Sequence, residues 1–254
     1  MTNLQGKKLV IFDLDGTLTP AKEHMKPSMA QALSELLKRI KVAVISGGGY
    51  PRMQTQFLRS LPHTAESFGN LYILPTSGTR LYMWQGDWQE RYHEDLSREE
   101  RKRIMEAFRP VLMACKHSPG KIYGELIEDR LSQVTFSGLG QEAPIDTKKQ
   151  WDPDHRKREA IIAALRPKLP EFDIRIGGTT SIDVTRRGVN KAYGIHKLEQ
   201  YLGIPISEMI FVGDALFYGG NDYPAKAAGV DCIEVKGPED TEKIIRNWFV
   251  PSSL

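Results

Sequence analysis

Carboxylates gather where two apolar runs of the sequence end. Asp13 and Asp15 close the first run, in the stretch VIFDLDGTLTP. Asp214 closes the run MIFVGD, and the loop after it carries Asn221 and Asp222. Carboxylates that lie close together repel one another unless a cation lies among them, and Mg²⁺ takes about six oxygen ligands near 2.1 Å. The acids therefore predict a Mg²⁺ site, provided that the two runs end at the same edge of the fold.

A hydroxyl, a glycine-rich turn and an ammonium accompany these acids. Ser46 follows the run KVAVI and precedes glycines 47–49, and Lys191 opens an expected helix. The N–H groups of such a turn suit phosphate oxygens, and a lysine nearby neutralises charge. With a phosphate held in this way, one aspartate can attack phosphorus and form an aspartyl-phosphate. A second carboxylate two residues further on can protonate the leaving oxygen and then activate water.

The elements that must position these groups alternate between strand and helix. Strands are expected at 8–12, 41–45, 71–75, 209–214 and 232–235, and helices at 29–40, 190–203, 222–229 and 238–249. Apolar residues of the first helix recur at the spacing of one helical face. Strands that alternate with helices predict a parallel, Rossmann-like α/β sheet. Ligands of such sheets bind beyond the carboxyl ends of the strands, which is where the acids and Ser46 fall.

The alternation is interrupted between residues 85 and 187. This segment begins with a highly charged stretch and a hydrophilic helix from about Ser97. It continues with strands of the antiparallel type and with a helix for which Asp154 is the expected N-cap. We therefore expect an α/β core built from residues 1–84 and 188–254, split by an inserted α+β domain at 85–187.

Composition narrows the class of protein. The chain has 254 residues, of which 40% are hydrophobic and 26% charged, and a net charge of +3. These values indicate a globular protein and do not favour a nucleic-acid partner. No apolar run approaches the ~18 residues of a membrane span, so we expect no membrane partner. The only two cysteines, Cys115 and Cys232, form no metal or disulfide pattern, which favours the reducing cytoplasm. Whether the protein is a monomer or a homodimer stays open.

Four stretches resemble, in order, the signature motifs of the haloacid dehalogenase (HAD) superfamily of phosphotransferases. They are FDLDGTLT, VISGG, the segment around Lys191, and GDALFYGGND. The resemblance implies that Asp13 is the nucleophile and Asp15 the general acid and base. It also implies that the phosphoryl group is bound by Ser46, Gly47 and Lys191. The implied Mg²⁺ ligands are Asp13, the main-chain carbonyl of Asp15, Asp214 and Asp222, and Asn221 lies beside them.

The insertion resembles the cap domain of HAD subclass IIB. Within that subclass, DLDGTLTPA, the GGND form of the fourth motif, and SIDV ahead of Lys191 are similar to eukaryotic-type phosphomannomutases. This resemblance implies a small phosphorylated substrate of the sugar phosphate type. It also implies that Ser181 and Asp183 contact the substrate.

The chain departs from the phosphomannomutase pattern where arginines are expected. Lys22 follows the TLTPA segment in place of an arginine, and Gln141 and Lys148 fall near the positions of two arginines that grip a second phosphate. Arg130 is a candidate to replace a third. Because lysine does not reproduce the two-pronged grip of arginine, we expect a Mg²⁺-dependent phosphatase that uses water as acceptor. A mutase that moves phosphate between sugar positions is the alternative.

Plainer interpretations of the same residues stay open. The SGGG turn could be an ordinary loop, and Lys191 an ordinary solvated lysine. Asp222 could cap the helix that follows it. Ser181 and Asp183 share one face of an expected strand, and that face could simply be hydrated.

A protein of another class could also carry this set of groups. Receiver modules of signalling proteins likewise group acids, a hydroxyl and a lysine at strand ends, and a partner phosphorylates their aspartate. Asp15, a ready acid and base, and an insertion of about a hundred residues favour an enzyme over such a module.

Overall fold

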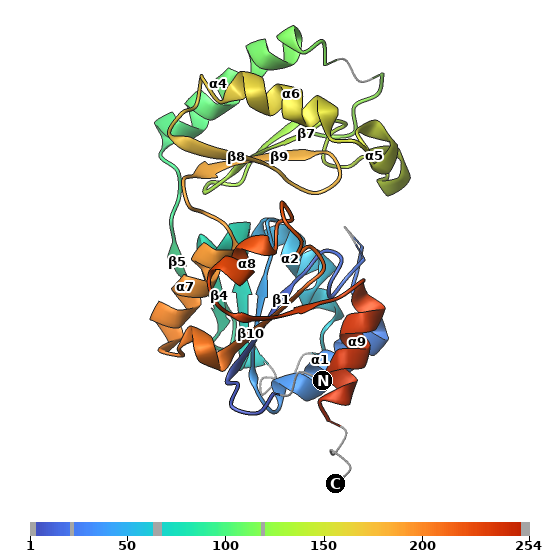
Figure 1. Cartoon of the computed structure of the whole chain (residues 1–254), viewed down its shortest axis with the longest axis vertical. Helices are drawn as coiled ribbons and strands as arrows, with labels where there is room; N and C mark the ends of the chain where they lie inside the picture. Colours follow the sequence, from blue (N-terminus) through green and yellow to red (C-terminus); the bar gives the residue numbers. More distant parts are fainter. Residues whose placement is uncertain (1–3, 21–22, 63–67, 118–119, 250–254) are drawn as a thin grey trace. The chain divides into compact units, whose positions relative to one another are not determined.

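The chain divides into two compact units. The computed structural model describes residues 4–20, 23–62, 68–117 and 120–249. Unit 1 consists of Met1–His93 and Asn190–Leu254, and unit 2 of Glu94–Val189 (Figure 1). No helix in the described ranges is both long enough and apolar enough to cross a membrane.

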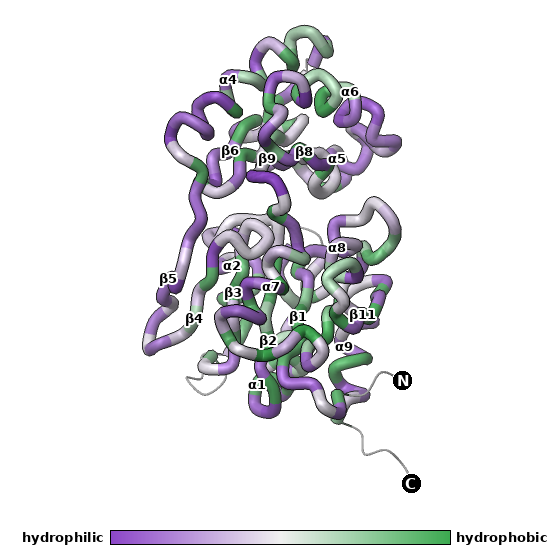
Figure 2. Tube along the Cα trace, turned by 60° about the vertical axis from the view of Figure 1, so that its left-hand side comes forward, coloured by the Kyte–Doolittle hydropathy of each residue, from purple (hydrophilic) through white to green (hydrophobic). Residues whose placement is uncertain are grey.

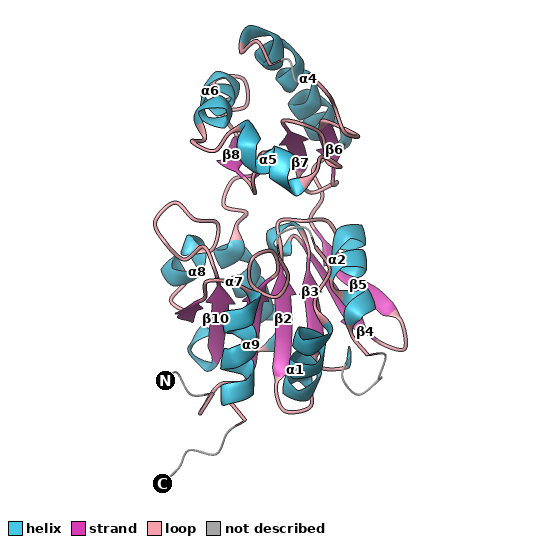
Figure 3. Cartoon of the chain, turned by 90° about the vertical axis from the view of Figure 1, so that its right-hand side faces the viewer, coloured by secondary structure: helices cyan, strands magenta, loops and turns pink. Residues whose placement is uncertain are grey.

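A seven-stranded sheet forms the centre of unit 1 (Figure 3). In spatial order its strands are β11 (Asp231–Glu234), β10 (Met209–Gly213), β1 (Leu9–Asp13), β2 (Lys41–Ile45), β3 (Leu71–Leu74), β4 (Arg80–Trp84) and β5 (Trp88–His93). The first five run parallel, and β4 and β5 form an antiparallel hairpin at one edge. The predicted α/β core with a parallel sheet is confirmed.

Helices cover both faces of this sheet. They are α1 (Pro27–Leu37), α2 (Tyr50–Gln56), α7 (Lys191–Leu202), α8 (Tyr223–Ala227) and α9 (Pro238–Asn247). Alternate residues of β1 enter two separate hydrophobic cores: Phe12 packs with α1, α2 and α9, and Ile11 packs with α7 and α8. Because both faces are covered, the central strands β1 and β2 are mostly apolar, and green dominates where they are labelled in Figure 2.

The register of the sheet aligns the ends of three neighbouring strands. Asp13, the last residue of β1, pairs with Ile45, the last residue of β2. On the other side of β1, Phe12 pairs with Val212 of β10. The residues that follow these strands therefore start from one edge of the sheet, which is the expected position of a ligand site.

The β4–β5 hairpin was not predicted, and it shifts the boundary between the two parts of the chain. Residues 85–93 were assigned to the insertion, but β5 pairs with β4 along the hairpin and so extends the sheet of unit 1. The second boundary falls after Val189 rather than after residue 187. The sequence WQERYH is charged because β5 is an edge strand with mostly half-buried or exposed side chains, which conceals its strand character.

Unit 2 is an antiparallel sheet with helices on one face. Its strands, in spatial order, are β6 (Ile127–Asp129), β7 (Val134–Ser137), β9 (Ser181–Arg186) and β8 (Phe172–Ile176), and its helices are α4 (Arg98–Ala114), α5 (Ile145–Trp151) and α6 (Arg156–Leu165). Phe136 and Ile182 point into a core shared with α4 and α6. The alternate residues Thr135, Ser181 and Asp183 therefore lie on the opposite face of the sheet.

The starts of the two long helices in unit 2 follow from local hydrogen bonds. Ser97 caps α4 in a reciprocal capping box with Glu100. At α6 the expected cap, Asp154, accepts the N–H of Arg156 at 3.4 Å, and Asp152 binds the N–H groups that follow. The carboxylate of Asp152 accepts the N–H groups of residues 157 and 158, at 3.0 and 3.2 Å, because His155 adopts a left-handed backbone that turns the chain back over the helix end.

Candidate active site

Three carboxylates meet at the carboxyl edge of the unit 1 sheet. Asp13 ends β1, and Asp214 and Asp222 belong to the loop between β10 and α8. One oxygen from each of the three side chains lies within 4.8 Å of the others. Asp222 is fully buried, Asp13 is 3% exposed and Asp214 is half-buried. This is a concentration of negative charge in a place with little water.

Lys191 lies among these acids and is itself buried. Its Nζ donates to Asp13 Oδ1 at 2.5 Å and also to Asp222 Oδ1. Lys191 is the first residue of α7, whose N-cap Asn190 accepts the N–H of Tyr193 at 3.2 Å. The helix cap thus fixes the backbone from which the ammonium reaches the carboxylates. Its position is not that of the solvated lysine that the sequence left open.

The pKa values of the three residues Asp13, Asp214 and Lys191 reflect an excess of negative over positive charge. Burial raises the pKa of Asp13 well above its ordinary value, and the neighbouring acids add to this, although Lys191 opposes it. Burial and the charge of Asp222 likewise raise the pKa of Asp214. Burial alone would lower the pKa of Lys191, but the charges of Asp13 and Asp222 outweigh it and raise that pKa. One ammonium does not compensate three carboxylates, so a further cation would stabilise their ionised forms.

The donor set fits a hard divalent cation. All three side chains offer carboxylate oxygens, which are preferred by Mg²⁺, and they converge closely enough to share one ion. Asp15, for which the main-chain carbonyl is the expected ligand atom, directs its carboxylate elsewhere. Asp13, Asp214 and Asp222 are therefore the side chains that would hold the ion, and the main-chain carbonyl of Asp15 stays a predicted ligand.

Two glycines and one backbone amide keep the acids in place. Gly16 has a φ of +88°, and a Cβ there would lie 2.5 Å from Asp214 Oδ2. A Cβ on Gly213 would lie 2.4 Å from Asp222 Oδ2. Ala215 donates its N–H to that same oxygen at 2.9 Å. The acids therefore pack directly against the backbone, where only glycine leaves enough room.

The Ser46 turn lies beside the acids in the order of the strands. Ser46 is buried directly after β2, and its Oγ accepts the N–H of Gly48 at 3.0 Å. Gly47, between them, is half-buried. That bond uses the hydroxyl oxygen as an acceptor, so the hydroxyl proton can be donated to an anion. The hydrogen bond between Ser46 and Gly48 defines the conformation of this turn at the carboxyl edge of the sheet.

Asp15 is held by two residues that the sequence analysis missed. Arg52 Nη2 lies 2.9 Å from both carboxylate oxygens of Asp15, and Gln56 Nε2 donates to Oδ1 at 2.8 Å. Both partners come from α2, the helix that begins just after the glycine turn. Their spacing of four residues, which puts them on one helix face, was the available signal.

Three motif positions remain: Asn221, Asp222 and Lys22. Asn221 is exposed. Asp222 stands at the N-cap position of α8, but its side chain makes no capping hydrogen bond, because Lys191 and Ala215 use both of its oxygens. The interpretation of Asp222 as a helix cap is therefore wrong. Lys22 lies outside the described residues.

Four residues assigned to the substrate belong to unit 2. Ser181 is 8% exposed on β9, and Asp183 accepts the hydroxyl of Thr135 at 2.8 Å. Arg130 donates to Glu128 Oε2 through Nε at 2.9 Å and through Nη2 at 2.6 Å. Ser181 and Asp183 share the polar face of the sheet. Arg130 is already bound to an acid.

Lys148 is the clearest departure from the predicted substrate site. It is 1% exposed, and its Nζ donates to the main-chain carbonyl of Gln141 at 2.6 Å. A lysine in this position fixes the loop before α5 and is not presented to solvent. Lys148 and Gln141, the two residues near expected arginine positions, therefore bind each other.

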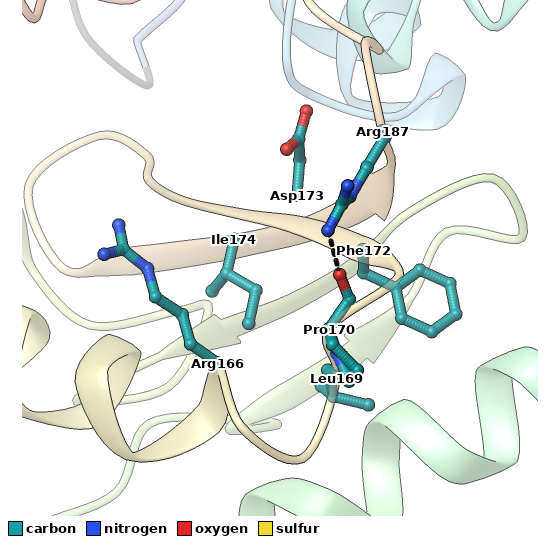
Figure 4. Close-up of a pocket in the computed structure, with 7 residues that line it drawn as sticks. All are labelled: Arg166, Leu169, Pro170, Phe172, Asp173, Ile174 and Arg187. Carbon is teal, nitrogen blue, oxygen red and sulfur yellow. Dashed lines mark hydrogen bonds between the residues drawn. The ribbon is translucent and has the colours of Figure 1, made fainter.

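A cavity of about 530 Å³ lies in unit 2, bordered by β8, by the connection that leads to it from α6, and by Arg187 after β9. Figure 4 shows Ile174 between Arg166 and Arg187, and Arg187 donating to the carbonyl of Pro170. None of the predicted site residues lines this cavity. Its residues bring together no set of catalytic groups.

The sequence is similar to phosphomannomutases along most of its length. The family model for eukaryotic phosphomannomutase matches residues 29–251. Spinach (Spinacia oleracea) phosphomannomutase is 28% identical over 248 residues, which cover 95% of this chain and 96% of the spinach protein. Human phosphomannomutase 1 is 28% identical over 251 residues, which cover 96% of this chain and 93% of the human protein.

The fold is similar to that of solved HAD-type structures. An N-terminally truncated IMP-nucleotidase from Plasmodium falciparum superposes with a TM-score of 0.71 at 17% identity, covering 97% of this chain and 71% of that one. A haloacid dehalogenase-like hydrolase from Bacteroides thetaiotaomicron gives 0.62 at 16% identity, covering 96% and 100%. At such identities the likeness concerns the fold alone. With the family match, it shows that the chain is an enzyme of the HAD superfamily and belongs to the eukaryotic phosphomannomutase family.

Proposed function

We propose that this enzyme transfers the phosphoryl group of a small phosphate ester, a sugar phosphate, to water. The observation that carries the proposal is the buried group of Asp13, Asp214, Asp222 and Lys191 at the carboxyl edge of the sheet. Three carboxylates and an ammonium at one point suit the binding of a cation and a phosphate together. The names of the similar proteins, phosphomannomutases, support a sugar phosphate as the substrate class.

The proposed reaction has two steps at phosphorus. A carboxylate oxygen of Asp13 attacks phosphorus, the bond from phosphorus to the leaving oxygen breaks, and Asp15 gives that oxygen its proton. Water then attacks phosphorus and gives its proton to Asp15. The bond to Asp13 breaks, and inorganic phosphate leaves. Both aspartates return to their starting forms.

The other residues bind and orient the phosphoryl group. Mg²⁺ held by Asp13, Asp214 and Asp222 would reduce the repulsion between the attacking carboxylate and the phosphate oxygens. Lys191 keeps Asp13 in position through its 2.5 Å hydrogen bond and adds positive charge. Ser46 and the backbone of Gly47 offer donors to the phosphate oxygens.

Unit 2 supports water, rather than a second sugar position, as the acceptor. A mutase must hold two phosphates in turn, and cationic groups are needed to grip the distant one. Two arginines lie on or near the described part of the polar face, and both are paired. Arg130 is paired with Glu128. Arg175 is bonded to Asp173 at 2.5 Å and to the carbonyl of Val189. Lys148 is buried. We propose that unit 2 acts as a cap, with Ser181 and Asp183 facing the sugar.

Phosphomannomutase activity is the second candidate, and the family match favours it. The test is incubation with Mg²⁺ and mannose 1-phosphate, with and without a hexose bisphosphate as primer. The proposal expects sustained release of inorganic phosphate in both cases, and loss of that release when EDTA removes the metal. Formation of mannose 6-phosphate that requires the primer, without net phosphate release, would contradict the phosphatase and establish the mutase.

A further inference from the structure

Helix α2 grips the carboxylate of Asp15 from one side. Arg52 Nη2 bridges the two carboxylate oxygens at 2.9 Å each, and Gln56 Nε2 adds a bond of 2.8 Å to Oδ1. Three contacts to one carboxylate define both its position and the plane in which it lies. Asp15 and Arg52 are about 30% exposed, so the grip lies at the surface of the site.

Arg52 and Gln56 are themselves held by further hydrogen bonds. Arg52 Nε donates to Gln56 Oε1 at 3.0 Å, and Gln56 Nε2 donates to the hydroxyl of Thr19 at 3.0 Å. Gln56 is 5% exposed and Thr19 is fully buried. A side chain held at both ends in this way loses little further freedom when it binds Asp15, unlike the partners of an ordinary surface ion pair.

The arginine also passes over the phosphate-binding turn. A Cβ placed on Gly48 would lie 3.5 Å from Arg52 Cδ, and the N–H of Gly48 is bonded to Ser46 Oγ. The same side chain therefore lies next to the turn that would hold the phosphate and is bonded to the carboxylate that would serve the leaving oxygen. Arg52 therefore lies between the two parts of the site.

We propose that Arg52 and Gln56 are positioning residues for Asp15, a role that rests on the proposed phosphoryl transfer. They hold the Asp15 carboxylate where it can reach the oxygen between phosphorus and the leaving group. Proton transfer in catalysis requires hydrogen-bond reach between the carboxyl and that oxygen. A small displacement of Asp15 would therefore slow reactions that need the proton and spare those that do not.

The test compares two esters of nearly the same size, phenyl phosphate and p-nitrophenyl phosphate, using kcat/KM, which reports the step in which the ester bond breaks. Nitrophenolate leaves without a proton more readily than phenolate. We expect Arg52→Met to lower kcat/KM about ten-fold or more on phenyl phosphate and less than about three-fold on p-nitrophenyl phosphate, because a positioned acid contributes on the order of 10²-fold. Arg52→Lys should restore part of the loss. Lysine keeps the charge but lacks the Nε bond to Gln56.

Arg246→Met is the matched control. Arg246 makes a 2.9 Å ion pair with Glu242 on α9, again four residues apart on one helix. This variant should leave the ratio of the two kcat/KM values unchanged. Equal losses on both esters in Arg52→Met, or no loss, would overturn the proposal. If Arg52→Met does not fold, Gln56→Met carries the same test, and an unchanged ester ratio there also overturns it.

Two further measurements separate this proposal from the proposed function. In an Asp15→Asn background, Arg52→Met should change kcat/KM less than about two-fold, because the two residues act as one unit. A full additional loss would overturn the positioning role while leaving the phosphatase intact. Crystals of the wild type should show one Asp15 rotamer and those of Arg52→Met a displaced one. An undisplaced Asp15 would overturn the proposal even if the wild type hydrolysed neither ester, a result that would refute the phosphatase itself.

Discussion

Asp13 and Asp15 are two residues apart but have very different surroundings. Asp13 is buried, bonded to Lys191 and close to two other acids. Asp15 is about 30% exposed and is bonded to Arg52. A buried carboxylate next to a cation site is suited to attack phosphorus, and a more exposed one is suited to exchange protons with a leaving group and with water.

The different roles of Asp13, which attacks phosphorus, and Asp15, which transfers protons, predict the effect of Asp15→Asn. We expect kcat/KM to fall about 10²-fold or more on phenyl phosphate and much less on p-nitrophenyl phosphate, because only the first leaving group depends strongly on a proton. Steady-state assays with the two esters measure the ratio. Equal losses on both esters would contradict the role of Asp15 as a general acid.

Single residues were predictable where their chemistry follows a strand. The acids after β1 and β10 and Ser46 after β2 could be placed at one edge from the alternation of strand and helix. Lys148 could not, because its burial depends on how the loop at Gln141 folds back over α5. Arg52 was missed because its spacing of four residues from Gln56 places the two on one helix face without indicating which group they bind. Only its distance to Asp15 reveals its role.

The loop between β1 and α1 shows how an element holds the site. Gly16 has φ +88° and lies so close to Asp214 that a Cβ would come within 2.5 Å of a carboxylate oxygen. Gly16→Ala should lower both stability and Mg²⁺ affinity, since it strains the backbone and displaces Asp214. Gly229→Ala is the control, because Gly229 has φ +81° with no atom within 4 Å of the Cβ position.

Calorimetric Mg²⁺ titration and thermal unfolding of the two variants separate these effects. Both should lose about 1 kcal/mol or more of stability from the left-handed backbone. Only Gly16→Ala should weaken Mg²⁺ binding, by about ten-fold or more, because a carboxylate ligand moves. Unchanged Mg²⁺ affinity in Gly16→Ala would show that Asp214 is not a ligand.

His117, just after α4, gives unit 2 a dependence on pH. Its ring lies edge-on to Phe136 and Trp151. Burial lowers its pKa below the usual 6.5, and Lys157 adds to this against a hydrogen bond with Gly138. The unfolded chain therefore binds a proton at a higher pH than the folded chain. Its contribution to stability is complete above about pH 6.5 and is lost as the pH falls towards the folded pKa.

Chemical unfolding at several pH values measures this effect. The free energy of unfolding should decrease as the pH falls below about 6.5, and His117→Gln should reduce the decrease. His196→Gln, at a half-exposed site on α7, is the control and should keep it. An equal pH dependence in the wild type and in His117→Gln would show that His117 is not the group responsible.

The elements that the sequence predicted well are those with two covered faces or clear caps. The strands β1, β2 and β3 are short apolar runs closed by polar or glycine-rich stops, so their boundaries agree with expectation to within a residue or two. The hairpin of β4 and β5 was missed because an exposed edge strand has a charged sequence that no buried pattern marks.

On the scale of the whole molecule, the chain contains separate hydrophobic cores. Two lie on the faces of the unit 1 sheet and one in unit 2. The carboxylates that would hold Mg²⁺ all belong to unit 1. Ligand binding stabilises the part of a protein that contains the site. We therefore expect Mg²⁺ to act on the unfolding of unit 1.

Thermal unfolding with and without Mg²⁺ tests this expectation. At about 100 times the dissociation constant, Mg²⁺ should add about 2.7 kcal/mol and raise the unit 1 midpoint by about 5 to 10 °C. Trp84 and Trp88 report unit 1, and Trp151 reports unit 2. Asp214→Asn should remove most of the shift. The same shift in the wild type and in Asp214→Asn would argue against the proposed metal site.

The central claim is that Asp13 carries the phosphoryl group during the reaction, and its most direct test is peptide mass spectrometry. Asp15→Asn is incubated with Mg²⁺ and p-nitrophenyl phosphate, quenched in acid and digested. This variant should form the intermediate but lack the base that hydrolyses it. We predict one added phosphoryl group on the peptide that contains Asp13, and none when Asp13→Asn is combined with Asp15→Asn. Turnover with an unmodified Asp13 peptide, or a phosphoryl group on another residue, would contradict the account.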